Sequence, residues 1–575
     1  MTASPAASGQ PSGAPPLSLA VEAHMAGRLA EAAALYRRVL AQAPFEAKVW
    51  NNLAFALIDL GRIAEAERAC RAAAALQPDY ASPFIGLGNL DSAHDRFGAA
   101  SRHWRRVMTL DPGQSEVAFN LGINLQNEGN APEAAVWFQE AVERLAGRPS
   151  LLSQRLLCLN YLDLPGERLL DEHRRFEAAY GRRGQPLPPH ANRPDPARRL
   201  RIGYLSVEFR THLGGYFLTP LFDGHDRSAF EIHCYSNLPD GAGDRLTPYF
   251  KEKADGWHSV HGLDDAALAA RVRADGIDIL VDLAGHSGLN RLPALALRPA
   301  PVQMTWLGYP NTTGMEAVDY RLVDAISDPP GPADAHAAER LLRLPAPFLC
   351  FRPPADAPAV VPLPAEAAGV ITFGSFNKLA KLSDGTIRLW AEVLRRTPAS
   401  RLLLKDKPLD CADTAAALRV RFQEAGVDPA RLILLGWTDD PAGHLGLYNR
   451  IDIALDPTPY NGTITTCDAL WMGAPVVTLL GERHAARVGA SLLASVGLAD
   501  LIAATPERYA ETAALLARDP ARLRDLRVGM RNRLLGSALC DERRFVRGLE
   551  AAYRQSWRAW CAGQDREAGS GRMPA

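Results

Sequence analysis

Two hydrophobic patterns divide this chain. Over about the first 150 residues, apolar positions recur at helical spacing, and the same columns return every 34 residues. One column holds small alanines and another holds large side chains: Ala32, Ala66, Ala100 and Ala134, with Tyr36, Cys70, Trp104 and Phe138. A small residue where two helices cross, followed one turn later by a large one, predicts about four stacked helical hairpins. Stacked hairpins of this kind form a superhelix with a concave groove.

The turns between the predicted helices repeat as well. Gly27, Gly61 and Gly129 occupy the turn in three units, and Asp95 occupies it in the remaining one. This is the tetratricopeptide (TPR) pattern, which we assign to residues 15–150 after a disordered tail at residues 1–14. A TPR groove predicts a protein or peptide partner.

The pattern changes after a predicted helical junction at residues 151–198. Short apolar runs rich in β-branched residues then alternate with helix-like segments. Five runs begin at residues 201, 230, 278, 301 and 320, and five more begin at residues 371, 400, 431, 451 and 475. Strands that alternate with helices predict parallel sheets covered on both faces. We therefore expect an α + α/β protein with two Rossmann-like halves, residues 199–352 and 369–555, joined by a linker at residues 353–368 and followed by a tail at residues 556–575.

Composition narrows the functional classes. The 575 residues are too many for one core, and the net charge of -1 leaves no basic excess for nucleic acid. No apolar run is long enough for a membrane span, and the eight cysteines form no CxxC pair, so we predict a cytoplasmic protein without a metal site. The sequence also has no GxGxxG and no GxxxxGK[ST] motif, which argues against a dinucleotide fingerprint and a P-loop. Oligomeric state is left open.

Loops after strands are the expected place for chemistry, because ligands of open α/β sheets bind beyond the carboxyl ends of the strands. In the first half, His212 follows the first run, and two glycines that permit close backbone approach come directly after it. Small polar loops follow the third and fourth runs. The candidates for a ligand-binding rim are Gly214, Gly215, His286, Pro310, Thr312 and Thr313. Each of these loops could equally be a plain turn.

The first loop of the second half carries positive charge. Asn377, Lys378 and Lys381 lie between a strand and a helix, where a lysine and a helix N-terminus together neutralise a diphosphate. His444 precedes the strand that begins near residue 451. The alternatives are a solvated lysine and an ordinary helix histidine.

A threonine-rich segment follows the strand at residue 451. The chain turns at Asn461 and Gly462, and a helix then begins with Thr463, Ile464, Thr465 and Thr466. Hydroxyls and unpaired backbone N–H groups form an anion cradle there, and Asp468 is placed to accept hydrogen bonds from ribose hydroxyls. The alternative is a threonine N-cap with an aspartate favoured by the helix dipole.

Five long motifs lie in order behind the TPR columns: GYLSVEFRTHLGGY, DLAGHSG, RPAPVQMTWLGYPNTTG, FGSFNKLAK and DPTPYNGTITTCDALWMGAPVVTL. Over roughly residues 15–555 the chain resembles the O-GlcNAc transferase/SPINDLY family. The resemblance implies a GT-B fold whose C-terminal half holds most of the donor. It also implies inverting transfer of GlcNAc from the co-substrate UDP-GlcNAc to Ser/Thr hydroxyls of proteins, without a metal or other cofactor.

Residue by residue, the resemblance assigns roles to five positions. His212 matches the histidine near the acceptor hydroxyl, a proposed base, and Lys381 matches the lysine that stabilises the leaving diphosphate. His444 matches a histidine beside the donor base. Thr465 matches a threonine near the diphosphate, and Asp468 matches the aspartate on the ribose.

Lys378 stands where the animal enzymes have a glutamine. Two departures leave the donor open: Thr463 replaces the donor-contacting histidine of the animal enzymes, and Pro441 replaces a lysine expected three residues before His444. The segment TITTC is more similar to SPINDLY, whose enzymes use GDP-fucose. A protein O-fucosyltransferase is therefore the first alternative. A TPR scaffold with an inactive transferase domain is the second, although such a scaffold has no need of Lys381 and Asp468. A glycan or lipid acceptor is the third, and the TPR array argues against it.

Overall fold

The computed structural model describes residues 16–181, 189–211, 213–345, 347–438 and 440–570. Contacts within the chain divide it into two compact units, residues 1–125 and 126–575, and each is described here by itself. Across the described ranges, no helix combines the length and the apolar character that crossing a membrane would require.

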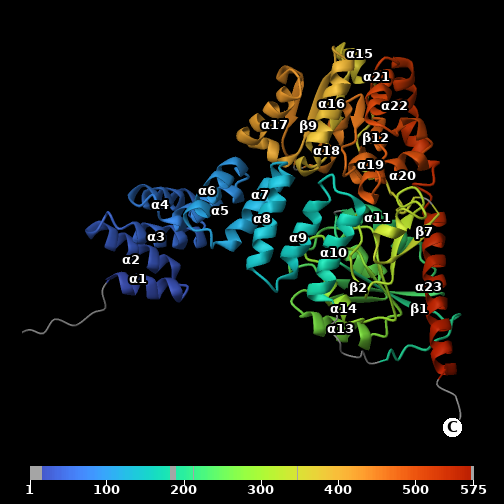
Figure 1. Ribbon diagram of the computed structural model, residues 1–575, viewed down its shortest axis with the longest axis horizontal. Coiled ribbons are helices and arrows are strands. Elements are labelled where there is room, and N and C mark those ends of the chain that lie inside the picture. Colours follow the sequence, from blue (N-terminus) through green and yellow to red (C-terminus); the bar gives the residue numbers. More distant parts are fainter. Residues whose placement is uncertain (1–15, 182–188, 212, 346, 439, 571–575) are drawn as a thin grey trace, which may run out of the picture. The chain divides into compact units, whose positions relative to one another are not determined.

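The first unit consists of helices joined by tight turns (Figure 1, blue). They are α1 (Pro16–Met25), α2 (Leu29–Gln42), α3 (Ala47–Asp59), α4 (Ile63–Leu76), α5 (Ala81–Ala93) and α6 (Phe97–Leu110), followed by α7 (Ser115–Asn127), which crosses the unit boundary. The periodic alanines Ala32, Ala66 and Ala100 are fully buried. Asp95 adopts φ 58°, beside φ 73° at Gly27 and 70° at Gly61. An aspartate tolerates this left-handed conformation, so the repeat keeps its turn without glycine. The predicted TPR architecture is confirmed.

The second unit begins with three more helices, α8 (Ala131–Arg144), α9 (Pro149–Leu159) and α10 (Gly166–Tyr180). A parallel sheet follows, in the order β3-β2-β1-β4-β5-β6-β7. Its strands are β1 (Leu200–Ser206), β2 (Phe230–Ser236), β3 (Gly256–Ser259), β4 (Ile279–Asp282), β5 (Val302–Thr305), β6 (Tyr320–Asp324) and β7 (Arg340–Leu344). Helices α11 (Leu213–Gly224), α12 (Thr247–Lys253), α13 (Asp265–Ala274) and α14 (Leu292–Ala296) connect them.

A second parallel sheet repeats the same topology, in the order β10-β9-β8-β11-β12-β13. Its strands are β8 (Thr372–Ser375), β9 (Arg401–Lys405), β10 (Leu432–Leu435), β11 (Ile453–Leu455), β12 (Val476–Leu479) and β13 (Ile502–Ala503). The helices are α15 (Pro364–Ala368), α16 (Asp384–Arg396), α17 (Ala412–Glu424), α18 (Pro441–Gly446), α19 (Ile464–Trp471), α20 (Val488–Ser495), α21 (Pro506–Ala517) and α22 (Pro520–Leu535). Two Rossmann-like halves therefore follow the TPR helices, as the sequence predicts.

The sequence pattern does not predict three of the strands. β3, β7 and β13 each lie at the edge of a sheet. β3 reads GWHS and is only half-buried, whereas β4 reads ILVD and is buried throughout. These three edge strands face water on more sides and lack the continuous apolar run of a central parallel strand, whereas the edge strand β10 reads LILL and is predicted.

The tail predicted at residues 556–575 does not begin at residue 556, because a helix continues through this position. Helix α23 runs unbroken from Glu542 to Ser570 (Figure 1, red). Trp557 is fully buried, and its indole nitrogen donates to the carbonyl oxygen of Asp195 at 2.9 Å. Val546 and Leu549 of the same helix join the core of the first sheet. The C-terminal helix thus returns to the first half, because its apolar stripe completes that core.

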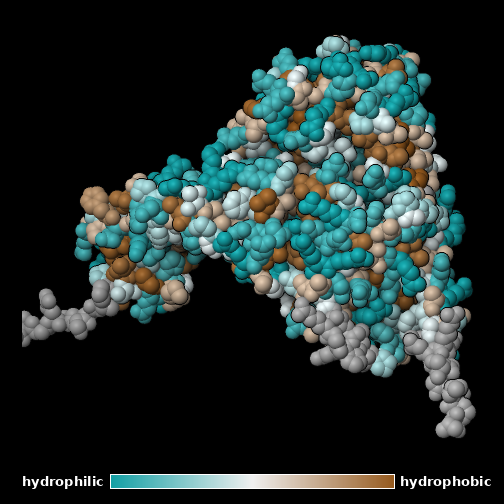
Figure 2. Space-filling view, in the orientation of Figure 1, coloured by the Kyte–Doolittle hydropathy of each residue, from teal (hydrophilic) through white to brown (hydrophobic). Residues whose placement is uncertain are grey.

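Each sheet has a hydrophobic core. The first includes Ile202 and Val281, and the second includes Phe373 and Leu403. Outside these cores, Figure 2 shows hydrophilic residues over much of the visible face, with hydrophobic residues scattered among them. Polar contacts also join the halves, since Ser491 donates to Asp324 at 2.6 Å and His484 contacts Asp328 at 2.5 Å.

Candidate functional site

The two loops with the strongest sequence signals flank the switch point of the second sheet. The strand order reverses between β8 and β11, so the chain leaves these neighbouring strands toward opposite faces. Asn377 follows β8, and Asp456 follows β11. A crevice at the carboxyl ends of two such strands is where open α/β sheets bind ligands. A small cavity there is lined by Asn377, Asp456 and Thr465 among others.

Lys381 projects into this crevice from the loop after β8. Its ammonium donates to the carbonyl oxygen of Asn461 at 2.7 Å and to Oδ1 of Asn377 at 3.2 Å. It also lies 4.5 Å from the ring centroid of Tyr460. Burial lowers the pKa of Lys381 to about 7, and the nearby Asp456 carboxylate opposes that shift. An anion bound here would favour the charged form and restore the proton.

A buried aspartate shapes the turn that faces Lys381. Asp456 accepts hydrogen bonds from the backbone N–H of Gly462 and from the hydroxyl of Thr478, both at 2.7 Å. Burial raises the pKa of Asp456 to about 6. A Cβ at Gly462 would lie 2.4 Å from Oγ1 of Thr465, so the close approach requires glycine at this position.

Helix α19 presents its N-terminus to the crevice with polar groups unused. Thr463 is the N-cap residue, but its side chain makes no capping hydrogen bond. Among the described residues, no acceptor takes the backbone N–H groups of residues 463–466, which include Ile464 and Thr466. The hydroxyl of Thr465 donates to Oδ1 of Asn377 at 3.0 Å, which ties the helix to the loop after β8. The arrangement is an anion cradle beside a cation.

One turn into α19, Asp468 lacks a donor. No described residue donates a hydrogen bond to its carboxylate, although the side chain is 7% exposed. Burial raises the pKa of Asp468 to about 7. Burial raises the pKa of Tyr216 in α11 and of Tyr448, and the Asp468 charge adds to both shifts. A buried carboxylate without partners is suited to accept hydrogen bonds from ligand hydroxyls.

Aromatic rings gather beside the cradle. The ring of His444 lies 6.0 Å from that of Phe376 and 5.9 Å from that of Tyr448. Burial lowers the pKa of His444 to about 4, so the imidazole is neutral at physiological pH. Flat apolar faces of this kind stack on a nucleobase. Lys378, by contrast, is exposed and directs no described hydrogen bond into the crevice.

Several residues of the site escaped sequence reasoning. Lys405 ends β9, is only 4% exposed, and places its ammonium 5.3 Å from the ring of Trp437. Tyr460, Tyr216 and Asp456 also lie at the site. Asp456 could have been found, because it directly follows a predicted strand. Tyr216 follows the two glycines of the first loop, but nothing in the sequence predicts its approach to α19.

The first loop of the first half holds the candidates His212, Gly214 and Gly215. His212 lies outside the described residues. Gly214 and Gly215 form the first turn of α11, and a Cβ at Gly215 would lie 2.7 Å from the carbonyl oxygen of Arg210. Glycine is therefore needed here for close packing next to Tyr216.

His286 is not an open rim residue, contrary to expectation. It is 1% exposed, its Nδ1 lies 3.0 Å from the hydroxyl of Ser153, and its Nε2 lies 2.8 Å from the carbonyl oxygen of Thr313. Rings of Phe176 and His173 pack against it at 4.7 and 5.4 Å. Helices α9 and α10 cover this loop, so both imidazole nitrogens are occupied within the protein.

Thr312 and Thr313 are not open either. Both are fully buried, and they donate to the carboxylate of Glu339, at 2.6 Å from the Thr312 hydroxyl and 2.6 Å from the Thr313 backbone N–H. Their hydroxyls therefore satisfy a buried acid. Pro310 is half-buried at the beginning of the same loop.

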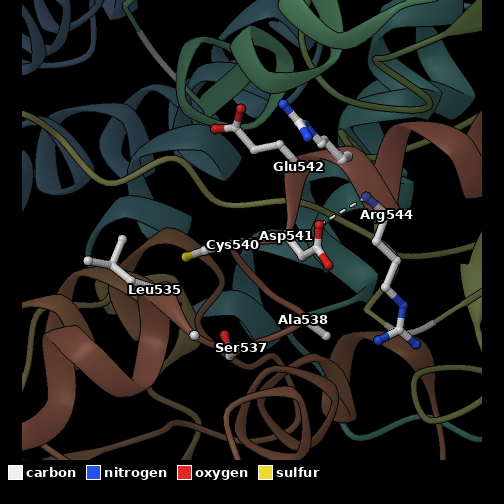
Figure 3. Close-up of a pocket in the computed structure, with 9 residues that line it drawn as sticks. Leu535, Ser537, Ala538, Cys540, Asp541, Glu542 and Arg544 are labelled. Carbon is white, nitrogen blue, oxygen red and sulfur yellow. Dashed lines mark hydrogen bonds between the residues drawn. The ribbon is translucent and has the colours of Figure 1, made fainter.

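A larger cavity of about 500 Å³ lies elsewhere, where α22 gives way to α23 (Figure 3). Asp541 accepts a hydrogen bond from the backbone N–H of Arg544 at 3.0 Å, which caps α23, and Glu542 pairs with Arg352 at 2.7 Å. The acidic groups of this cavity are thus used in the fold, and its lining contains none of the predicted site residues.

Comparison with known proteins agrees with this geometry. A tetratricopeptide repeat family matches residues 23–83, and glycosyl transferase family 41 matches residues 185–351 and 359–549. A probable UDP-N-acetylglucosamine–peptide N-acetylglucosaminyltransferase SPINDLY of Solanum lycopersicum is 40% identical over 416 residues, covering 71% of this chain and 44% of that protein. The Arabidopsis thaliana protein named SEC is 30% identical over 383 residues, covering 64% of this chain and 38% of its own length. The chain thus spans less than half of these relatives.

A solved structure agrees over nearly the whole chain. A mutant of the Thermobaculum terrenum O-GlcNAc transferase superposes with a TM-score of 0.80 and 38% sequence identity, covering 90% of this chain and 98% of its own. The family match covers both sheets and extends into the C-terminal helix. The chain belongs to glycosyl transferase family 41.

Proposed function

We propose that this protein is an inverting, metal-independent glycosyltransferase that moves GlcNAc from UDP-GlcNAc to Ser/Thr hydroxyls of proteins. The observation that carries the proposal is the crevice between β8 and β11. There Lys381, the unused N–H groups at the start of α19 and the unpartnered Asp468 together complement a sugar nucleotide. The cation and the helix N-terminus suit the diphosphate, and the carboxylate suits the ribose.

The reaction follows from where charge develops. The acceptor oxygen attacks the anomeric carbon, its proton passes to a base, and the bond between that carbon and the β-phosphate oxygen breaks. Negative charge then builds on the leaving diphosphate. Fixed donors at that point lower the barrier more than any other contact, so Lys381 carries the main catalytic role. By resemblance, His212 is the candidate for this base.

The acceptor side of the proposal rests on the helical repeats. A TPR superhelix offers a groove for polypeptide, and the names of the relatives specify a peptide acceptor. We therefore propose that protein substrates are held by the repeats and that their hydroxyls reach the crevice beside α11.

GDP-fucose is the second candidate donor, and one observation favours it. Lys405 stands near the rings that would stack on a base, and guanine offers lysine two adjacent acceptors, O6 and N7. Uracil offers single carbonyl oxygens.

A panel of four ligands tests both donors. Purified full-length protein is titrated calorimetrically with UDP, GDP, UDP-GlcNAc and GDP-fucose, without added metal, and donor hydrolysis is followed in parallel. Selective binding of UDP with hydrolysis of UDP-GlcNAc is the expected result. Selective binding of GDP would instead indicate a fucosyltransferase that uses GDP-fucose. A folded protein that binds none of the four would overturn both and leave a TPR scaffold.

A further inference from the structure

A stack of two tyrosines connects the helical junction to the proposed catalytic lysine. Tyr161 comes directly after Asn160, the C-cap residue of α9, and is 6% exposed. Its ring lies 5.1 Å from that of Tyr460, with an angle of 25° between the planes. The Tyr460 ring also lies under the Lys381 ammonium, which is 4.5 Å from the ring centroid. A residue outside both Rossmann-like halves therefore supports the aromatic surface on which the lysine rests.

The segment that carries Tyr161 is fixed to both halves. Beside it, the amide nitrogen of Asn160 donates to the Tyr309 hydroxyl at 2.8 Å, and its amide oxygen accepts from Asn311 at 2.9 Å. On the other side, Arg483 donates to the carbonyl oxygen of Leu162 at 2.8 Å. Hydrogen bonds on either side of Tyr161 thus hold its backbone in place, so its ring is a firm backing for Tyr460.

We propose that Tyr161 is a positioning residue for Lys381: by stacking on Tyr460 it holds that ring, and through the ring the ammonium, in place for the leaving diphosphate. The proposal rests on the proposed function. A lysine side chain has several rotatable bonds, and a desolvated ring face restricts them while attracting the cation. Tyr161 touches no ligand in this role, which distinguishes it from Lys381.

The charges around Lys381 predict a signature of this role. Asp456 after β11, Lys378 on its own loop and Asp406 after β9 are the charged groups that act on it. None of them contacts Tyr161 by a described hydrogen bond. Loss of the Tyr161 ring would admit water beside Tyr460, and the burial that lowers the pKa of Lys381 would weaken. The pKa would then rise toward its ordinary value.

The test compares Tyr161→Ala with Tyr161→Phe, which keeps the ring and removes a hydroxyl that has no described partner. UDP and GDP are titrated from pH 6 to 9, and kcat and KM for donor hydrolysis are measured at each pH. For Tyr161→Ala we expect kcat at pH 7 to fall about tenfold, since a displaced catalytic group loses rate steeply. The pH at which nucleotide affinity declines should rise by about one unit, and Tyr161→Phe should match the wild type.

Tyr180→Ala controls for general damage to the helical junction. Tyr180 ends α10 and packs on Phe176 at 5.0 Å, away from the loop of Tyr460. Should Tyr161→Ala fail to fold, Tyr161→Leu keeps the volume without an aromatic face and serves in its place. An unchanged pH profile in the folded variant, or an equal change in Tyr180→Ala, would refute the positioning role. Absence of nucleotide binding by the wild type would instead refute the proposed function.

Discussion

The loops after β4 and β11 occupy equivalent places in two sheets of the same topology, yet they differ in function. The loop after β4 carries His286, whose ring nitrogens are both occupied within the protein. The loop after β11 leads to α19, where the Thr463 side chain makes no cap and Asp468 has no described donor. One loop has its polar groups satisfied internally, and the other keeps them for a ligand.

The difference comes from what covers each loop. Helices α9 and α10 bring Ser153, His173 and Phe176 onto the loop after β4 and bury it. At the second sheet, the ring of Tyr161 from this junction reaches Tyr460 rather than the helix start. Composition of a loop therefore says less about binding than the presence of a neighbour that can satisfy its polar groups.

The largest effect is expected at Lys381. Lys381→Met keeps the length of the side chain and removes its charge, so turnover should fall by about 10²–10³-fold, the usual cost of losing one donor to a developing anion. Donor hydrolysis at saturating UDP-GlcNAc or GDP-fucose measures it. The matched variant Lys378→Met removes an exposed charge of the same loop and should cost little. Equal losses of turnover in the two variants would contradict the different roles of Lys381 and Lys378.

The next effect is a pH dependence of nucleotide affinity. Burial lowers the pKa of Lys381 to about 7, so the free protein loses this proton as pH rises through that value. Because the diphosphate needs the ammonium, binding above pH 7 must take up a proton, and affinity should fall by up to about tenfold per pH unit. Calorimetry in buffers of different ionisation enthalpy detects the uptake. Proton release on binding would contradict this assignment.

A smaller effect is expected at Gly462. In Gly462→Ala the new Cβ would meet the hydroxyls of Thr465 and Thr466 at 2.4 and 2.7 Å. The crowding should weaken nucleoside diphosphate binding by about tenfold, or about 1.4 kcal/mol. Gly529→Ala in α22 is the matched control, since neither glycine has a left-handed backbone and a Cβ at Gly529 meets nothing within 4 Å. Unchanged binding by Gly462→Ala would show that the cradle lies elsewhere.

The smallest effect on activity is expected in the first half. Thr313→Val removes a hydroxyl that donates to the buried Glu339 carboxylate. The free energy of unfolding should fall by about 1–3 kcal/mol, the cost of a buried acceptor that loses a partner, while nucleotide affinity stays the same. Chemical denaturation and nucleotide titration separate the two. If nucleotide affinity fell while the free energy of unfolding stayed the same, the loop of Thr313 would belong to the binding site.

Much of the fold could be predicted from the sequence. The 34-residue columns identified the helical repeats, because each hairpin must place a small residue at the helix crossing. The central strands were found from continuous apolar runs, since both faces of a parallel sheet are buried. The edge strands β3, β7 and β13 and the return of α23 were missed. Their burial is partial or depends on surfaces far away in the sequence.

For the site, the sequence by itself determined which residue types lie at the ends of β8 and β11: a lysine, an Asn-Gly turn and a threonine-rich helix start. Local rules suffice for this, because strand ends, turns and caps are set by neighbouring residues. Only the tertiary structure decided which polar groups remain free. Thr312, Thr313 and His286 find partners on segments distant in sequence, whereas Asp468 finds none among the described residues. Whether a polar group is satisfied depends on long-range packing, which no local pattern records.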